Sequence, residues 1–143
     1  MNHSMERVFK YRKRTPLGGL AADLTAESFR SSTPPAHGVQ IYYKFWIIPP
    51  EGLHWADLAW LCFGASLSGE SLSSLHPEGL CVKIHSLTFP LVDYRPEVAA
   101  VAMDGWLHDE FQLPETGVRV DFNSGPCEYN FHWGGVTPFS NAY

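Results

Sequence analysis

Residues 79–90 read GLCVKIHSLTFP, and residues 38–49 read GVQIYYKFWIIP. Both segments open with glycine and an aliphatic residue, carry one lysine and close with proline after the same number of residues. Apolar and polar residues alternate in each, which is typical of a β-strand with one buried face. A helical pattern follows each segment, so the repeated unit predicts the order strand–helix–strand–helix.

The two helices are expected at residues 53–65 and 94–113. The serine- and glycine-rich stretch 66–74 ends the first helix and is interpreted as a flexible loop. The second helix begins with Asp93 as a favourable N-cap and Pro96 in its first turn, where a missing N–H costs nothing. The Asp-Tyr-Arg-Pro-Glu stretch is therefore explained as a helix start and needs no chemical role.

Two further strands are expected at the C-terminal end, GVRVDFN at 117–123 and CEYNFHW at 127–133. The Asn-Ser-Gly-Pro sequence between them favours a hairpin turn, because Asn and Gly tolerate positive φ. A phase slip near Ser86 also predicts a β-bulge in the strand at 79–90.

These elements predict an α+β fold of the order β-α-β-α-β-β. It is a two-layer sandwich, with a four- or five-stranded mixed or antiparallel sheet and two helices packed on one face. The predicted organisation is a basic N-terminal arm or edge segment at 1–37, a single α+β domain at 38–133 and a C-terminal tail at 134–143.

Composition indicates one globular domain. The chain has 143 residues, of which 45% are hydrophobic and 14% aromatic, with five tryptophans. Three cysteines form an odd set without a C-x-x-C motif, which favours free thiols and a cytoplasmic location. No apolar run approaches the roughly 20 residues of a membrane span, so no membrane association is expected.

The net charge of −5 is unevenly distributed, because residues 1–30 carry +3 and the remainder −8. A basic arm on an acidic body suggests nucleic-acid or ribosome binding as one hypothesis. The acidic body would repel phosphates, so nucleic acid is not the preferred partner. An acidic surface instead favours a basic protein partner.

No nucleophile elbow, zinc-protease motif, phosphate-binding loop or dinucleotide fingerprint is present. Acidic residues and histidines occur at helical spacing in two places, but no third cluster supports them as metal ligands. We therefore expect neither a metal site nor a cofactor.

The polar side of the predicted sheet is the candidate site. It collects cations from three strands together with amide and aromatic side chains, and these are the predicted binding residues: Tyr42, Lys44, Trp46, Lys83, Arg119 and Asn130. Trp46 and Arg119 are the expected anchors, since Trp and Arg dominate many interfaces. A histidine beside a carboxylate on the same face would form an acid–base pair, and the candidates are His85, His132, Asp121 and Glu128.

Three functions remain open. The first is a non-catalytic protein-binding module of the inhibitor or immunity kind, using this sheet face. The second is a small biosynthetic enzyme or ligand-binding protein, of the isomerase or cyclase type, in which the histidines act on a small anionic ligand. The third is a nucleic-acid binder that uses the basic N-terminal arm.

The strand–proline–acid–helix unit from Cys81 to Trp106 resembles the strand-to-helix passage in the fourth domain of elongation-factor-G-type GTPases. The resemblance covers less than a quarter of the chain and includes no catalytic motif, so it implies no function here.

Overall fold

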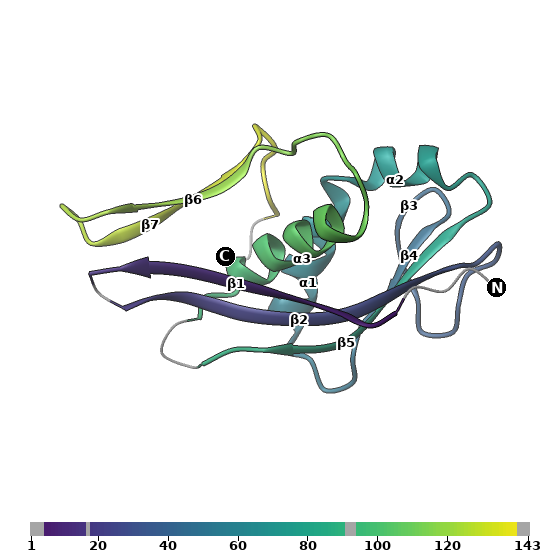
Figure 1. Cartoon of the computed structure of the whole chain (residues 1–143), viewed down its shortest axis with the longest axis horizontal. Helices are drawn as coiled ribbons and strands as arrows, with labels where there is room; N and C mark the ends of the chain where they lie inside the picture. Colours follow the sequence, from purple (N-terminus) through teal and green to yellow (C-terminus); the bar gives the residue numbers. More distant parts are fainter. Residues whose placement is uncertain (1–4, 17, 91–93, 140–143) are drawn as a thin grey trace.

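The computed structural model describes residues 5–16, 18–90 and 94–139 (Figure 1). The strands are β1 (Arg7–Thr15), β2 (Gly18–Arg30), β3 (Val39–Tyr42), β4 (Phe45–Ile48), β5 (Leu80–Thr88), β6 (Val118–Asn123) and β7 (Glu128–Trp133). The helices are α1 (Trp55–Ser66), α2 (Gly69–Leu75) and α3 (Glu97–Glu110). The second predicted helix, expected over residues 94–113, covers Glu97–Glu110 with Pro96 at its N-cap position, so Pro96 precedes the first turn instead of lying in it. Asp93, the predicted N-cap, lies outside the described residues.

The main sheet has five strands in the order β1-β2-β5-β4-β3. β4 and β5 run parallel, and the other neighbours run antiparallel, so the predicted α+β class with a mixed sheet is confirmed. Helix α3 packs against β1 and β2, and α1 packs mainly against α3. We call the sheet face against α3 the inner face and the opposite face the outer face.

The element order differs from the predicted one in three ways. Residues 7–30, expected as an arm or edge segment, form the long β1–β2 hairpin, which supplies two strands of the main sheet. The segment 38–49 is a hairpin, β3 and β4, rather than one strand, because the chain turns at Tyr43 and Lys44, where Lys44 has φ 53°. The stretch 66–74, interpreted as a loop, contributes most of α2.

The predicted β6–β7 hairpin is confirmed, but it forms a separate two-stranded sheet. An aromatic cluster attaches it to the body. Trp133 lies 5.6 Å from Trp60 and 5.2 Å from Phe63 of α1, and Phe139 lies 4.7 Å from Trp60. At the other end of the hairpin, the hydroxyls of Tyr129 and Thr15 lie 3.3 Å apart, which brings the hairpin to the end of β1 (Figure 1).

The predicted bulge near Ser86 is also confirmed. Thr25 pairs with Ser86 and Ala26 pairs with Ile84, so His85 between them has no opposing residue in β2. A bulge redirects the side chain of the extra residue, and His85 thereby reaches the carboxylate of Glu27.

The cysteines differ sharply in exposure, and this predicts their reactivity. Cys81 is buried and Cys127 is exposed. Burial raises the pKa of the Cys81 thiol to about 12, partly offset by Lys83. Since the thiolate is the reactive form, we expect iodoacetamide at about pH 8 to alkylate Cys127 in the native protein and to leave Cys81 unmodified. Peptide mass spectrometry would measure this, with the unfolded protein as the control in which both react.

Asp104 of α3 is a buried carboxyl group whose Oδ1 accepts a hydrogen bond from Thr116 at 2.7 Å. Burial raises its pKa, against the lowering effects of Thr116 and His108. A folded pKa above the unfolded value means that ionisation destabilises the fold. The ionised Asp104 lowers the free energy of unfolding by its full amount above the folded pKa. It has no such effect below the unfolded pKa of about 3.9.

We therefore expect Asp104→Asn to melt at a higher temperature than the wild type at about pH 8, because asparagine still accepts from Thr116. The difference should shrink as the pH falls towards about 4. Thermal unfolding followed by circular dichroism would measure it, with Asp109→Asn on the exposed side of α3 as the control. A lower melting temperature of Asp104→Asn at every pH would contradict the prediction.

Candidate binding groove and acid–base pair

The predicted binding residues do not share one surface. Lys83 lies on the outer face of the main sheet, opposite Glu27. Arg119 and Asn130 lie on the separate β6–β7 hairpin. Two further candidates, Tyr42 and Lys44, lie at the β3–β4 turn, where Tyr42 is exposed and Lys44 is half-buried.

Trp46, the expected aromatic anchor, is only 4% exposed. It pairs with Gln40 and Cys81, and Cys81 is fully buried, while Phe45 and Ile47 are buried on the other side of the same strand. The sheet is thus covered on both faces at this point, and Trp46 offers little surface to a partner in this conformation.

Among the acid–base candidates, His132 and Asp121 do meet. His132 Nε2 lies 2.9 Å from Asp121 Oδ2, and Arg119 Nε lies 3.5 Å from the same oxygen. All three side chains are exposed, with fractions from 38% to 65%. Glu128 lies at the far end of β7, opposite Asn123. An exposed ion pair of this kind contributes little to stability, and exposures of 38% to 65% leave its side chains accessible to water.

His85 makes a more enclosed pair. Its Nε2 lies 2.7 Å from Glu27 Oε1, with side-chain exposures of 29% and 16%, and Glu6 Oε1 lies 3.8 Å from the same nitrogen. The sequence offered no signal for Glu27 as the partner, because the pairing depends on the register between β2 and β5 and on the bulge. His85 borders a cavity of about 700 Å³ that Lys83 and Glu51 also line.

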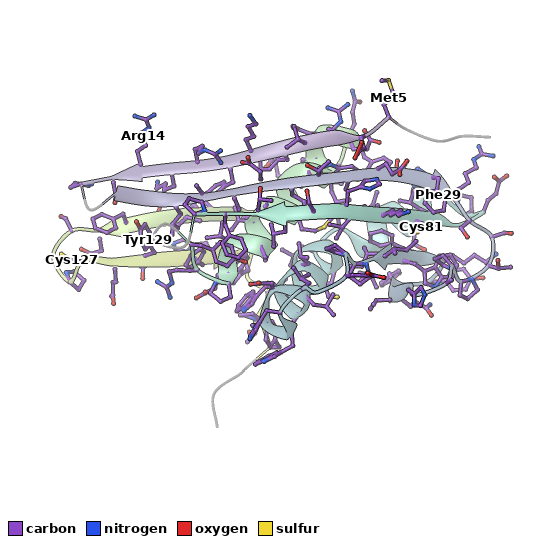
Figure 2. All side chains as sticks on the ribbon, turned by 90° about the horizontal axis from the view of Figure 1, so that it is seen from below. Met5, Arg14, Phe29, Cys81, Cys127 and Tyr129 are labelled. Atoms are coloured by element: carbon purple, nitrogen blue, oxygen red, sulfur yellow. The ribbon has the colours of Figure 1, made fainter. Side chains whose placement is uncertain are left out.

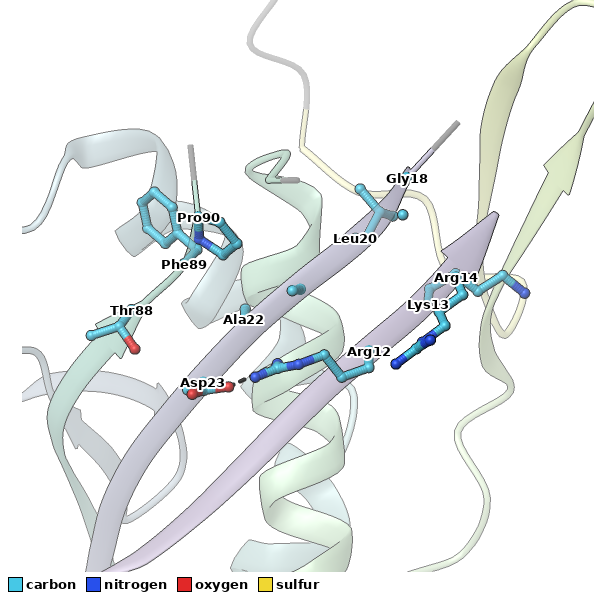
Figure 3. Close-up of a pocket in the computed structure, with 12 residues that line it drawn as sticks. Arg12, Lys13, Arg14, Gly18, Leu20, Ala22, Asp23, Thr88, Phe89 and Pro90 are labelled. Atoms are coloured by element: carbon cyan, nitrogen blue, oxygen red, sulfur yellow. Dashed lines mark ion pairs between the residues drawn. The ribbon is translucent and has the colours of Figure 1, made fainter. Parts of the chain in front are cut away.

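A second cavity, of about 480 Å³, lies over the turn end of β2 (Figure 3). Three consecutive basic residues of β1 line one side, and Thr88, Phe89 and Pro90 line the other; the complete lining is Arg12, Lys13, Arg14, Gly18, Gly19, Leu20, Ala21, Ala22, Asp23, Thr88, Phe89 and Pro90. We call this cavity the basic groove.

The floor of the basic groove consists of small residues. Arg12 is the cross-strand partner of Ala21, and Arg14 is the partner of Gly19, so each arginine shares a sheet face with a residue that has little or no side chain. Arg12 reaches along this open floor to Asp23, whose Oδ1 lies 2.8 Å from its Nη1 (Figure 3). That Asp23 oxygen is buried and, within the described chain, accepts no well-aligned hydrogen bond.

The charge of the basic groove is positive, because Arg12 and Arg14 face the single carboxylate of Asp23. Lys13 borders the groove, but it is the cross-strand partner of the core residue Leu20, so its side chain points to the other face of the sheet. Arg14 projects from the edge of the sheet (Figure 2). Sequence reasoning identified these basic residues but assigned them to an arm or edge segment outside the α+β domain; β1 is in fact the edge strand of the main sheet.

Comparison with known proteins gives no assignment: no family model, curated protein or solved structure matches the chain. Among the described side chains, no group of three or more His, Cys, Asp and Glu residues is placed to hold a metal ion. The three described helices are too short or too polar to cross a membrane.

Proposed function

We propose that this chain is a non-catalytic protein-binding module of the inhibitor or immunity kind, and that it binds an acidic segment of its partner in the basic groove. The observation that carries the proposal is the placement of Arg12 and Arg14 beside the small residues Ala21 and Gly19. Arginine side chains bind carboxylates through paired, charge-assisted hydrogen bonds, and the open floor leaves room for a ligand chain beside them.

The surface and the partner's charge differ from those favoured by the sequence. The net charge of −5 suggested a basic partner, but Arg12 and Arg14 both line one cavity, the basic groove. A local basic site on an acidic protein favours one orientation of an acidic ligand, because the rest of the surface repels it.

The test is a cross-linking pull-down from native lysate with three forms of the protein. The groove variant is Arg14→Glu, which leaves the Arg12–Asp23 ion pair in place. The matched control is Arg119→Glu, which makes the same charge change at an exposed arginine outside the groove. We expect one stoichiometric protein partner, cross-linked through an acidic segment, that the groove variant loses and the control variant retains.

Retention of that partner by the groove variant, or its loss from the control variant alone, would overturn the assignment to the basic groove. Circular dichroism of all three forms confirms that a loss of binding does not come from unfolding.

The second candidate function is that of a small enzyme or ligand-binding protein. It would bind a small anionic ligand in the cavity beside His85 and carry out acid–base chemistry on it. The 2.7 Å contact between His85 and Glu27 supports it, since a carboxylate fixes the ring orientation of a histidine base. Native mass spectrometry of the freshly purified protein would detect a retained small molecule. His85→Gln should lose that molecule, and His132→Gln, on the β6–β7 hairpin, should keep it.

A further inference from the structure

Helix α3 continues into a linker, residues 111–117, that leads to β6 (Figure 1). His108, in the last turn of α3, reaches across to this linker. Its Nδ1 lies 2.8 Å from the carbonyl oxygen of Asp104, and its Nε2 lies 3.1 Å from the carbonyl oxygen of Pro114. Both ring nitrogens therefore face backbone acceptors.

The protonation of the His108 ring decides how many of these contacts are hydrogen bonds. A carbonyl oxygen can only accept, so a ring nitrogen must carry a proton to bond to it. The imidazolium form has two N–H groups and donates to both oxygens. The neutral ring has one N–H group, so its other nitrogen turns a lone pair towards a carbonyl oxygen. Deprotonation of His108 therefore removes one of the two hydrogen bonds.

The surroundings of the ring determine which hydrogen bond is lost. The carboxylate oxygen Oδ1 of Asp104 lies 3.6 Å from Nδ1, which favours a proton on that nitrogen. The contact with the Asp104 carbonyl is also partly buried, whereas the contact with the Pro114 carbonyl is exposed. Water can replace Nε2 at the exposed carbonyl, and a buried acceptor without a donor costs more. We therefore expect the neutral ring to keep its proton on Nδ1 and to release Pro114.

Two other contacts hold the ends of the linker independently of His108. The amide of Phe111 donates to a carbonyl oxygen one turn earlier in the chain at 2.9 Å. The hydroxyl of Thr116 donates to Asp104 Oδ1 at 2.7 Å. Pro114 lies between these two fixed points. Loss of its hydrogen bond would therefore loosen residues 112–115 and leave the linker attached at both ends.

The groups around the ring stabilise its protonated form. Burial lowers the pKa of His108, but the carbonyl groups of Asp104 and Pro114 and the carboxylates of Asp104 and Glu115 raise it by more, so the pKa lies above its ordinary value of 6.5. In the described part of the chain, the charged groups that act on the ring are Asp104 from α3 and Glu115 from the linker. The stabilisation by the protonated ring is therefore complete below the ordinary pKa, and it is lost as the pH rises through the folded pKa.

We propose that His108 acts as a pH-sensitive latch on the linker between α3 and β6. The protonated ring ties Pro114 to α3, and its deprotonation frees residues 112–115. This device is independent of the proposed binding of an acidic segment, because neither His108 nor the linker lines the basic groove.

The test is a nuclear magnetic resonance titration of the full-length protein from about pH 5 to about pH 9. The nitrogen shifts of the His108 ring report its protonation and its neutral tautomer. The backbone order parameters of Gln112, Leu113 and Glu115 report the mobility of the linker. We expect a neutral ring protonated on Nδ1. We also expect the order parameters to fall from about 0.85 towards about 0.6, with the same midpoint as the His108 titration.

Two variants separate His108 from the other histidine beside the linker. His108→Gln removes the titrating ring, so the order parameters of its linker should no longer change over this pH range. The matched control is His76→Gln, because the His76 ring lies 5.2 Å from the Phe111 ring. This variant should keep the pH dependence of the wild type.

Three results would each overturn the latch. The first is a neutral His108 ring protonated on Nε2, because that tautomer keeps the bond to Pro114. The second is a set of order parameters that stays constant while the ring titrates. The third is the wild-type pH dependence in His108→Gln. The first two are measured on the wild type, so they decide the question even where His108→Gln does not fold.

Discussion

Trp106→Ala is expected to lower the free energy of unfolding by about 3–5 kcal/mol, the range found for buried aromatic residues truncated to alanine. The Trp106 side chain is fully buried in α3. Its Nε1 also donates a hydrogen bond of 2.9 Å to the carbonyl oxygen of Arg7 in β1. The substitution therefore creates a cavity and also leaves a backbone acceptor of β1 without its side-chain donor.

Urea unfolding followed by far-ultraviolet circular dichroism would measure this loss. The matched control is Trp55→Ala at the start of α1, since Trp55 is 58% exposed. Its effect should stay within about 0.5 kcal/mol, as for most surface substitutions. Similar losses for the two variants would contradict the placement of Trp106 in the core.

Gly64→Ala is expected to destabilise the protein by about 1–3 kcal/mol, the usual cost of overpacking. In an exposed helix the same change would add about 1 kcal/mol of stability. Here α1 and α3 approach so closely that a Cβ at residue 64 would lie 2.4 Å from the carbonyl oxygen of Ala100 and 2.8 Å from its Cα. Both neighbours are backbone atoms, so the helices themselves must move apart.

Gly105→Ala provides the comparison, because a Cβ there would meet the Phe9 ring at 2.2 Å rather than backbone. Truncating that ring with Phe9→Ala should make Gly105→Ala neutral or stabilising, whereas Gly64→Ala should stay destabilising in the same background. A double-mutant cycle by urea unfolding would measure both. Neutral behaviour of Gly64→Ala alone would show that α1 and α3 do not pack this closely.

The elements with regular patterns could be predicted from sequence. The apolar periodicity of α1 and α3, the alternation in β5 and the turn residues between β6 and β7 are all local signals, and the structure contains each of these elements. The phase slip near Ser86 correctly located the bulge for the same reason, because a bulge changes the alternation within one strand.

The β1–β2 hairpin was not recognised as part of the sheet because its strands lack the usual composition. β1 carries Lys10, Arg12 and Arg14 on alternate positions, which is typical of a charged edge strand that discourages aggregation. The core side of β2 relies partly on alanine, such as Ala22 and Ala26, and alanine is uncommon in strands. Pairing with β5 and packing against α3 outweigh this weak propensity.

The turn at Tyr43 and Lys44 was missed because apolar–polar alternation continues through it without a glycine or proline. Because residues 38–49 were predicted as one continuous strand, Trp46 was assigned to the polar face of the sheet. The partner of His85 could not be predicted because Glu27 and His85 are far apart in sequence and meet only through the bulged register of β2 and β5.

The strand order also has a consequence for how the chain acquires its structure during synthesis. β1 with β2 and β3 with β4 are two hairpins that share no pairing with each other, and β5 joins them by inserting between β2 and β4. An isolated hairpin is marginally stable at best in water. We therefore expect the first four strands to join into one continuous sheet only after residues 80–88 have left the ribosome.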